Sequence, residues 1–356
     1  MKKNKTSKYN IYYFANMAAQ FLQIIPIYNK IGGYFITAYP FFETWIKMNL
    51  KFGLGSTKFV FKREEIDKKI KGILISQSAT NLFPKTDNII RVYTGHGVSD
   101  KQYETPSRKL NAESFDYFFL TGPKDLHRLE LAIDDVNQLH KKIVPIGMIR
   151  SDNIINKIYD PISIKEKYGI NNHKKIVLYT PTYKKDGGTL DFLFEKIINE
   201  LKLEFNIIIR PHYYDKILFK KHLKYIKINK LNNVKYIYKF NTDLTELFTI
   251  SDILIGDRSS VDYDFVFTGK PIIRIKGNYI NYIKPPDIYD INKYCFHYDP
   301  YKNNLLKLAK NAIDDKEYSK RIVELRNNCF YFNDGKALER ACNKINELLE
   351  NLKEQK

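Results

Sequence analysis

The stretch Ser251–Ile275, with the sequence SDILIGDRSSVDYDFVFTGKPIIRI, decides the fold of this chain. Ile253–Ile255 is a short, continuous apolar run, which is typical of a parallel strand buried on both faces. Ser259 is a good N-cap, and Asp262 stands three residues on, where a carboxylate can reach the free amides of the first helical turn. Gly269 suits the left-handed residue that ends a helix. The stretch therefore predicts a strand–helix–strand unit, whose strand-to-helix turn is where parallel sheets bind ligands.

The composition is that of a globular protein with a large excess of positive charge. The chain has 356 residues, enough for two α/β domains, and 44% of them are hydrophobic. Its 59 Lys and Arg face 40 Asp and Glu, and the formal net charge of +19 indicates a polyanionic partner or an acidic surface. Nucleic acid, anionic lipid and phosphorylated substrates all fit this charge. Because no helix-turn-helix, zinc-finger or RNA-binding signature occurs, we expect no specific nucleic-acid partner.

The N-terminal run Tyr9–Asn29 carries no charge and has two interpretations. Its length would just cross a bilayer. Several Asn and Gln residues and Pro26 interrupt it, however, and no small-residue cleavage site follows. We therefore expect a buried strand, Ile11–Ala15, followed by a core helix. Peripheral attachment to a membrane stays open, since each basic residue near an acidic leaflet contributes about 1 kcal/mol.

The cysteines indicate a reducing compartment. Cys295, Cys329 and Cys342 lie far apart, form no C-x-x-C pair and would leave one thiol over if two were bridged. We expect a cytoplasmic protein held peripherally at the cytoplasmic face of the cell membrane.

The rhythm of apolar runs predicts two domains, residues 1–155 and 156–356. The strands expected in the first are Ile11–Phe14, Tyr34–Thr37, Phe59–Phe61, Gly72–Ser76, Ile89–Tyr93, Phe115–Leu120 and Ile143–Ile146. Helices are expected at Met17–Tyr28, Phe41–Leu50, Arg63–Ile70 and Pro123–Ala132. The strands expected in the second are Ile176–Thr180, Ile207–Arg210, Val234–Ile237, Ile253–Ile255 and Ile272–Ile275.

Two further stretches complete this organisation. The polar stretch Arg150–Tyr168 suits a connector between the domains. The tail Tyr301–Leu352 is expected to form two or three helices, the last of which crosses back to the first domain. Neither half contains a G-x-G-x-x-G, so a nicotinamide has no support and no cofactor is expected.

One strand end of the first domain carries a histidine between two glycines, Gly95-His96-Gly97. Glycines let the backbone and a ligand approach closely, and they offer the imidazole no side chain to pack against. His96 is therefore a poor core histidine and a candidate general base, against the alternative of a structural or exposed ring.

Three strand ends of the second domain should face one edge of its sheet. They carry donors suited to a diphosphate, namely Thr182 and Lys184, Arg210 and His212, and Ser259 and Ser260. The dipole of the helix start contributes only about 0.3 to 1 kcal/mol, so the charged groups must supply the rest. A plain turn after Thr180 and a buried structural His212 are the competing interpretations.

Asp262-Tyr263-Asp264 matches a D-x-D metal motif. On a helix, residues two apart point in different directions and cannot share an ion, so no metal site is expected.

These motifs resemble those of the bacterial CDP-glycerol glycerophosphotransferases, which build teichoic-acid backbones. The opening stretch is similar to the family pattern S-D-x-L-I-T-D-Y-S-S-V-x-F-D-F, which its Asp257, Ser259, Ser260 and Asp264 match. Gly256 in place of Thr, Arg258 in place of Tyr and Tyr263 in place of Phe depart from that pattern.

The other motifs occur in the same order as in the family, over roughly Gly95 to Gly335. W-H-G-T-P-x-K resembles the segment holding His96, Gly97 and Lys101. Y-A-P-T-W-R is similar to the segment ending at Lys184, where lysine replaces arginine and loses its bidentate fork. An R-x-H-P-type segment resembles Arg210-Pro211-His212, and G-x-P-R-x-D resembles the residues around Arg150.

The resemblance implies an α/β fold of two Rossmann-like domains facing a central cleft, which is GT-B-like. It implies transfer of glycerol phosphate, or a related alcohol phosphate, from a CDP-activated donor to a hydroxyl of a cell-surface glycan or lipid-linked polymer, with release of CMP. His96 and His212 would be catalytic. The donor would be bound by Thr182, Lys184, Arg210, Asp257, Ser259, Ser260 and Asp264, with support from Gly95, Gly97, Lys101 and Arg150.

Two other functions stay open. A GT-B glycosyltransferase using a nucleotide sugar would hold its diphosphate with the same groups. A non-catalytic polyanion-binding protein would explain the charge but not the histidines and the paired serines.

Overall fold

The computed structural model forms two compact units and describes residues 10–15, 18–37, 57–59, 70–77, 88–95, 97–100, 114–170, 172–239, 242–277 and 284–354. The first unit comprises Met1–Gly97, Pro106–Asp152 and Tyr331–Lys356, and the second comprises Val98–Thr105 and Asn153–Phe330. The expected single boundary after residue 155 is therefore replaced by four crossings of the chain, at 97/98, 105/106, 152/153 and 330/331. The predicted return of the tail to the first unit is found.

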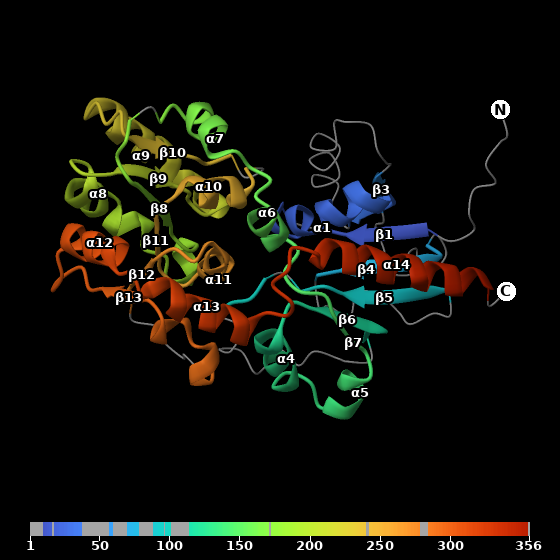
Figure 1. Ribbon diagram of the computed structural model, residues 1–356. Coiled ribbons are helices and arrows are strands. Elements are labelled where there is room, and N and C mark those ends of the chain that lie inside the picture. Colours follow the sequence, from blue (N-terminus) through green and yellow to red (C-terminus); the bar gives the residue numbers. More distant parts are fainter. Residues whose placement is uncertain are drawn as a thin grey trace. The chain divides into compact units, whose positions relative to one another are not determined.

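The described part of the first unit contains a parallel sheet of seven strands in the order β3-β2-β1-β4-β5-β6-β7 (Figure 1). The strand order reverses between β1 and β4, as in Rossmann folds. The strands are β1 (Asn10–Phe14), β2 (Tyr34–Thr37), β3 (Thr57–Phe59), β4 (Gly72–Ser76), β5 (Ile89–Tyr93), β6 (Tyr117–Leu120) and β7 (Ile143–Pro145).

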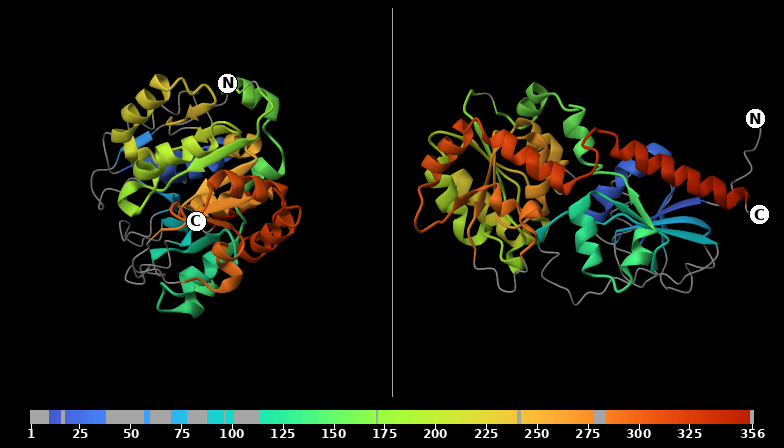
Figure 2. Two further views of the ribbon diagram at one scale, coloured as in Figure 1. Left: turned by 90° about the vertical axis from the view of Figure 1, so that its left-hand side faces the viewer. Right: turned by 60° about the horizontal axis from the view of Figure 1, so that its bottom comes forward.

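Two helices from opposite ends of the chain cover one face of this sheet. Apolar side chains of α1 (Ala18–Ile31) and α14 (Ala337–Glu354) join those of β1, β4 and β5 in one buried cluster. Figure 2 shows α14 lying along these strands. The other helices in the described part of the unit are α4 (Pro123–Glu130) and α5 (Val136–His140), and α6 (Ser151–Ile155) spans the crossing after Asp152.

The N-terminal run forms the buried strand and core helix that its polar residues predicted. Tyr13 in β1 is fully buried, and its hydroxyl donates to the carbonyl of Gly32, 2.8 Å away. Among the residues that the structure describes, no helix is long and apolar enough to span a membrane.

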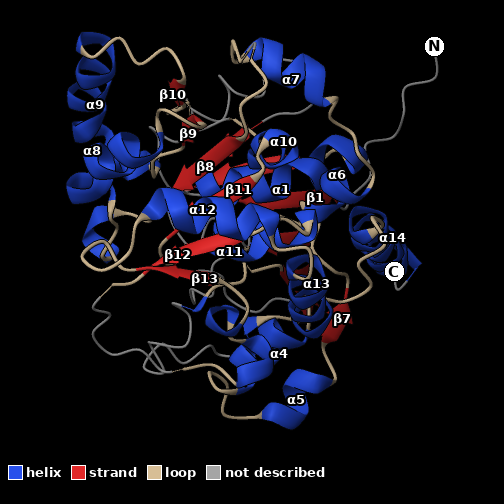
Figure 3. Cartoon of the chain, turned by 60° about the vertical axis from the view of Figure 1, so that its left-hand side comes forward, coloured by secondary structure: helices blue, strands red, loops and turns tan. Residues whose placement is uncertain are grey.

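The second unit contains a parallel sheet whose six described strands follow the order β10-β9-β8-β11-β12-β13 (Figure 3). This is the Rossmann order again, with the reversal between β8 and β11. The strands are β8 (Ile176–Thr180), β9 (Asn206–Ile209), β10 (Val234–Tyr236), β11 (Ile253–Gly256), β12 (Ile272–Ile275) and β13 (Phe296–Tyr298). The sequence prediction of two Rossmann-like α/β domains is confirmed.

The central strands β8 and β11 are buried at every residue, as expected for a sheet that helices cover on both faces. One face packs against α8 (Leu190–Leu201), α9 (Lys216–Ile228) and α12 (Leu305–Asp314). The remaining helices are α7 (Pro161–Lys167), α10 (Leu244–Ile250), α11 (Ser260–Phe265) and α13 (Tyr318–Cys329). The polar stretch expected to be a connector thus holds two short helices, α6 and α7. Helix α7 packs against α10. Asn153 of α6 and the Tyr159 hydroxyl donate to Asp243, the N-cap of α10, at 3.0 and 2.7 Å.

Predicted strand boundaries differ from the structure by one or two residues at several ends. The segment Phe59–Phe61 begins two residues earlier, in β3, and residues 60 and 61 lie outside the described part. The helices expected at Phe41–Leu50 and Arg63–Ile70 also fall almost entirely outside it. The sequence did not predict β13, since it has three residues and a polar His297 at its centre.

Candidate active site

The candidate site of the second unit lies where its strand order reverses. Thr180 ends β8 beside Gly256, the last residue of β11, and Ile209 ends β9 beside Tyr179. The segments that follow these three strands therefore emerge at one edge of the sheet. This edge is the usual ligand site of an open parallel sheet.

Asp257, the first residue after β11, fixes the loop that follows β8. Its carboxylate is 1% exposed and accepts hydrogen bonds from the amide of Thr182 at 2.8 and 3.0 Å and from the amide and hydroxyl of Thr189 at 3.1 Å. Within this loop, a Cβ on Gly188 would lie 1.9 Å from the carbonyl oxygen of Thr182, so only glycine fits. Asp257 and Thr182 are thus brought together as the sequence predicted, with the carboxylate turned toward the loop.

The paired serines begin α11. Ser259 is the predicted N-cap, and its hydroxyl accepts a hydrogen bond from the amide of Val261 at 3.3 Å. Ser260 is the first helical residue and is partly exposed, whereas Asp264 is buried on the same helix. Arg258, which replaces the Tyr of the resembled pattern, is 6% exposed and therefore does not face water.

The spacing of Asp262 predicted that its carboxylate reaches back to the first turn of α11, and this prediction is wrong. Its carboxylate is fully buried, with Oδ2 3.1 Å from Nε of Arg274 on β12. Gly256 makes room for it, because a Cβ at that position would lie 2.1 Å from Oδ1 of Asp262. Burial raises the pKa of Asp262 to about 7, against the opposing effect of Arg274.

Asp262 belongs to a buried charged cluster that also includes Asp100, Tyr263 and Arg274. Asp100 Oδ2 lies 3.2 Å from NH1 of Arg274, and Asp100 Oδ1 accepts a hydrogen bond from the Tyr263 hydroxyl at 2.5 Å. Gly256 and Tyr263 both depart from the resembled pattern, and both serve this cluster: Gly256 makes room for Asp262, and Tyr263 binds Asp100. An arginine inside the apolar strand Ile272–Ile275 is the signal that could have predicted it, because a buried guanidinium needs a carboxylate.

Aromatic rings surround His212 after β9. The imidazole stacks on Tyr213 with ring centroids 4.7 Å apart, and the rings of Tyr183 and Tyr214 each lie 5.3 Å away. Nδ1 of His212 accepts from the amide of Tyr214 at 3.3 Å, which leaves the proton on Nε2. His212 is partly exposed, not the buried structural histidine of the competing interpretation. Sequence reasoning missed these tyrosines, although His-Tyr-Tyr directly after a strand was a signal.

The two cationic candidates beside this ring cluster are already engaged with protein groups. Lys184 Nζ pairs with the carboxylate of Asp191 at the start of α8, which raises the lysine pKa. Arg210 donates from NH1 to the carbonyl oxygens of Pro211 and Ile237, at 3.2 and 3.5 Å, and its burial lowers its pKa to about 10. Both residues lie at the predicted edge, with their charges partly compensated.

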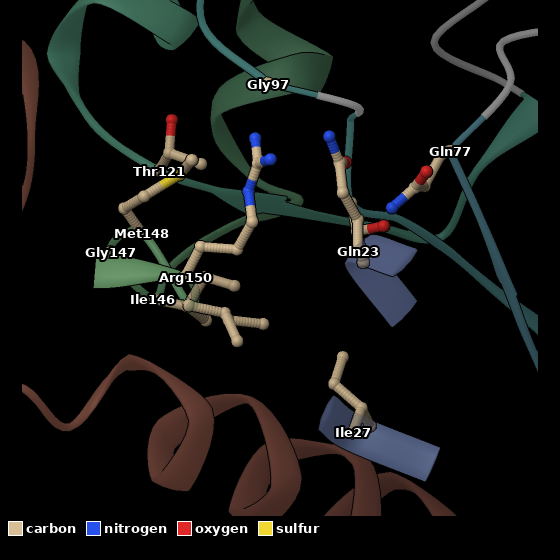
Figure 4. Close-up of a pocket in the computed structure, with 11 residues that line it drawn as sticks. Gln23, Ile27, Gln77, Gly97, Thr121, Ile146, Gly147, Met148 and Arg150 are labelled. Atoms are coloured by element: carbon tan, nitrogen blue, oxygen red, sulfur yellow. The ribbon is translucent and has the colours of Figure 1, made fainter. Parts of the chain in front are cut away.

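In the first unit, the glycines on both sides of residue 96 have positive φ angles. Gly95 has φ +61° and Gly97 has φ +115°, in the left-handed region that favours glycine. His96 and Lys101 themselves lie outside the described residues. Arg150 follows β7 and lines a pocket together with Gln23 and Gln77 (Figure 4).

Asp152, two residues after Arg150, caps the returning helix. Its carboxylate accepts from the amides of Ala337 and Leu338, at 3.1 and 2.8 Å, which satisfies free amides at the start of α14. In the described part of the chain, no three His, Cys, Asp or Glu side chains are grouped so that they could hold a metal ion.

Sequence comparisons identify one family. The profile of the family described as CDP-Glycerol:Poly(glycerophosphate) glycerophosphotransferase matches residues 71–347. The chain is 29% identical over 258 residues to the teichoic acid poly(glycerol phosphate) polymerase of Bacillus spizizenii, covering 65% of this chain and 61% of that protein. It is 31% identical over 170 residues to the teichoic acid glycerol-phosphate primase of Bacillus subtilis, covering 45% and 39%. The chain thus spans less than two thirds of the length of these relatives.

Solved structures share the fold. The wall teichoic acid polymerase TagF superposes with a TM-score of 0.68 at 20% identity, covering 97% of this chain and 90% of that one. A Staphylococcus aureus MnaA structure with UDP superposes with a TM-score of 0.63 at 15% identity, covering 96% and 97%.

Proposed function

Because the chain belongs to the CDP-glycerol:poly(glycerophosphate) glycerophosphotransferase family, we propose that it moves an alcohol phosphate, most simply glycerol phosphate, from a CDP-activated donor. The acceptor is a hydroxyl of a cell-surface glycan or lipid-linked polymer, and CMP leaves. The observation that carries the proposal is the match of the family profile over residues 71–347. The geometry of the strand ends supports it in detail.

The donor binds to the second unit at the edge where β8, β9 and β11 end. Asp257 holds the loop after β8 in place, and the partly exposed Ser260 offers its hydroxyl and amide at a start of helix where anions are favoured. His212, whose Nδ1 accepts from the amide of Tyr214, donates from Nε2 to a phosphate oxygen. The rings of Tyr183 and Tyr214 next to it provide apolar faces against which a pyrimidine can stack.

The cations at this edge have a secondary role in the proposal. Lys184 reaches a phosphate by exchanging Asp191 for the ligand, an exchange that an exposed lysine makes at little cost. Arg210 is tied to two carbonyl oxygens and contributes its charge to the surrounding field. Asp264 supports α11 from inside the unit.

The chemical step is an in-line displacement at the phosphorus that carries the alcohol. The acceptor oxygen forms the new P–O bond, the bond to the bridging oxygen breaks, and that oxygen leaves with CMP. His96 takes the proton of the acceptor hydroxyl. A positioned base of this kind contributes a rate factor of about 10² to 10⁴. Positioning and neutralisation of phosphate charge supply most of the remainder.

The test is nucleotide release from CDP-glycerol, CDP-ribitol and UDP-sugars in the presence of acceptor polymer. We expect CMP from a CDP-alcohol. Release of UDP from a sugar nucleotide alone would make the chain a glycosyltransferase, and binding to polyanions without any turnover would make it a binding protein.

Two histidine substitutions test the assigned roles. His96→Ala should lower turnover at least about 100-fold and leave binding of the CDP donor nearly intact. His212→Ala should weaken donor binding. His173→Ala is the matched control, because that side chain is exposed, and it should match the wild type. Near-normal turnover of His96→Ala would remove its role as the base.

We also propose that the chain works at the cytoplasmic face of the cell membrane as a peripheral protein. The charge of +19 favours an acidic leaflet, and none of Cys295, Cys329 and Cys342 forms a disulfide. Co-sedimentation with anionic vesicles at low salt, lost at high salt and absent with neutral vesicles, is expected. Equal sedimentation with both vesicle types would contradict the charge-based attachment.

A further inference from the structure

The first unit has its own pocket at the point where its strand order reverses. Gln77 directly follows β4, Thr94 follows β5, Thr121 follows β6 and Arg150 follows β7, while Gln23 comes from α1. The pocket thus collects polar side chains from the carboxyl ends of four neighbouring strands. About 420 Å³ of empty space lies within the pocket, and part of it is open solvent.

Two buried polar atoms in this pocket have no hydrogen-bond partner among the residues that the structure describes. They are Oε1 of Gln77, a residue that is 3% exposed, and Oγ1 of Thr94. Figure 4 shows Gln77 beside the space that Gln23 and Arg150 also enter, with its amide nitrogen on the side of Gln23. Because native proteins seldom leave buried polar atoms unsatisfied, these two indicate a ligand that supplies the missing hydrogen bonds.

The chemistry of the pocket wall defines the class of ligand. The Gln77 Oε1 accepts a hydrogen bond, which a hydroxyl group of a ligand can donate. The guanidinium of Arg150 suits a phosphate, which it can bind with two parallel hydrogen bonds. Ile27, Ile146 and Met148 form an apolar side that suits a carbon chain. A short polyol that carries a phosphate satisfies all three features.

The same inventory argues against the nucleotide donor. Among the described residues that line the pocket, none has an aromatic ring on which a base could stack. The rings of the described site in the second unit gather around His212 instead. The two units therefore differ in the ligand chemistry that they offer.

We propose that this pocket binds the terminal polyol-phosphate unit of the acceptor, with its phosphate on Arg150 and its hydroxyls on Gln77 and Thr94. This assignment rests on the proposed transferase function and gives the acceptor a specific place. Gly97, which follows His96 in the sequence, lines the same pocket.

Direct binding tests the pocket independently of catalysis. The probe is sn-glycerol 3-phosphate, followed by calorimetry and by thermal shift with the full chain. The variants are Gln77→Leu, which removes the unpaired oxygen at similar volume, and Arg150→Met. Gln138→Leu, at a partly exposed position of α5, is the matched control. We expect binding by wild type and control, and at least about tenfold weaker binding by both pocket variants, as the loss of one good polar contact gives.

Two comparisons decide the chemistry. Inorganic phosphate and glycerol should each bind at least about tenfold more weakly than glycerol phosphate, since each satisfies one part of the pocket. Equal binding of phosphate alone would overturn the role of Gln77 and Thr94. Binding of glycerol phosphate that is unchanged in Gln77→Leu and Arg150→Met would overturn the site itself.

Steady-state kinetics separates this proposal from the proposed function. In Gln77→Leu, the KM for acceptor should rise at least about tenfold, while the KM for the CDP donor stays within about twofold. A donor KM that rises together with the acceptor KM would contradict the assignment to the acceptor. Absence of CMP release by the wild type, with glycerol phosphate still bound in the pocket, would refute the transferase function and leave the polyol-phosphate site standing.

A structural role of Gln77 predicts a different result. Leucine removes a buried oxygen that has no partner, so the melting temperature of Gln77→Leu without ligand should equal or exceed that of the wild type. A lower melting temperature together with unchanged affinity for glycerol phosphate would mean that Gln77 only supports the fold.

Discussion

Gly256 should tolerate alanine only when Asp262 is shortened. A Cβ on Gly256 would lie 2.1 Å from Oδ1 of Asp262, whereas Cβ atoms in proteins essentially never approach other atoms closer than 3.0 Å. The carboxylate must therefore move by about 0.9 Å, the difference of these two distances. Such a shift would carry it away from the guanidinium of Arg274, 3.1 Å from Oδ2.

The expected cost follows from these contacts. Overpacking of a tight interior costs about 1 to 3 kcal/mol. Weakening a buried ion pair adds to this, so we expect Gly256→Ala to lower the free energy of unfolding by about 2 to 4 kcal/mol. In an Asp262→Ala background the obstacle is gone. Gly256 does not have a positive φ, so alanine should then stabilise the chain by about 0.4 to 1 kcal/mol through the unfolded state.

Urea unfolding followed by circular dichroism measures the four members of this double-mutant cycle. The sign of the Gly256→Ala effect should reverse between the two backgrounds, with a coupling energy of at least about 2 kcal/mol. Asp262→Ala alone is the control for loss of the ion pair. The same destabilisation by Gly256→Ala in both backgrounds would refute the steric explanation of this glycine.

Three further outcomes follow from buried carboxylates. The pKa of Asp262 in the folded protein is about 7, above its unfolded value, so the stability that this group contributes is full below about pH 4 and is lost as the pH rises through 7. Asp262→Asn should therefore reduce the pH dependence of the unfolding free energy between pH 5 and 8. An unchanged pH dependence would contradict this. Tyr263→Phe removes the hydrogen bond to Asp100 and should cost about 1.5 to 3 kcal/mol in urea unfolding, whereas Tyr301→Phe, at a ring 91% exposed, should change stability by less than about 0.5 kcal/mol; equal effects would refute the role of that hydroxyl. Asp152→Ala should cost about 1 to 2 kcal/mol through loss of the cap of α14, and calorimetry showing an unchanged melting temperature would disprove this.

The strands could be predicted because both sheets are parallel and buried. Runs such as Ile253–Ile255 and Gly72–Ser76 are continuous and apolar, and this pattern does not depend on which side chains pack against the strand. The helix after β11 was also predictable, because Ser259 and Gly269 act locally as its cap and its left-handed end.

The direction of buried charged side chains was not predictable from local spacing. Asp262 stands at the position of a capping carboxylate, yet Arg274, twelve residues on, attracts it into the interior. Asp257 likewise serves amides 68 and 75 residues away in sequence. Such long-range pairs depend on strand neighbours, which a single sequence does not specify.

The first unit contains segments from both ends of the chain, and this determines the order in which the two units can fold during translation. Residues 153–330 emerge from the ribosome as one block, and they form most of the second unit. The first unit must wait for Ile345 and Leu348, since these side chains complete the layer over Ile73 and Ile75. Before α14 is synthesised, one hydrophobic face of this sheet is exposed on the nascent chain, and we expect chaperones to bind there.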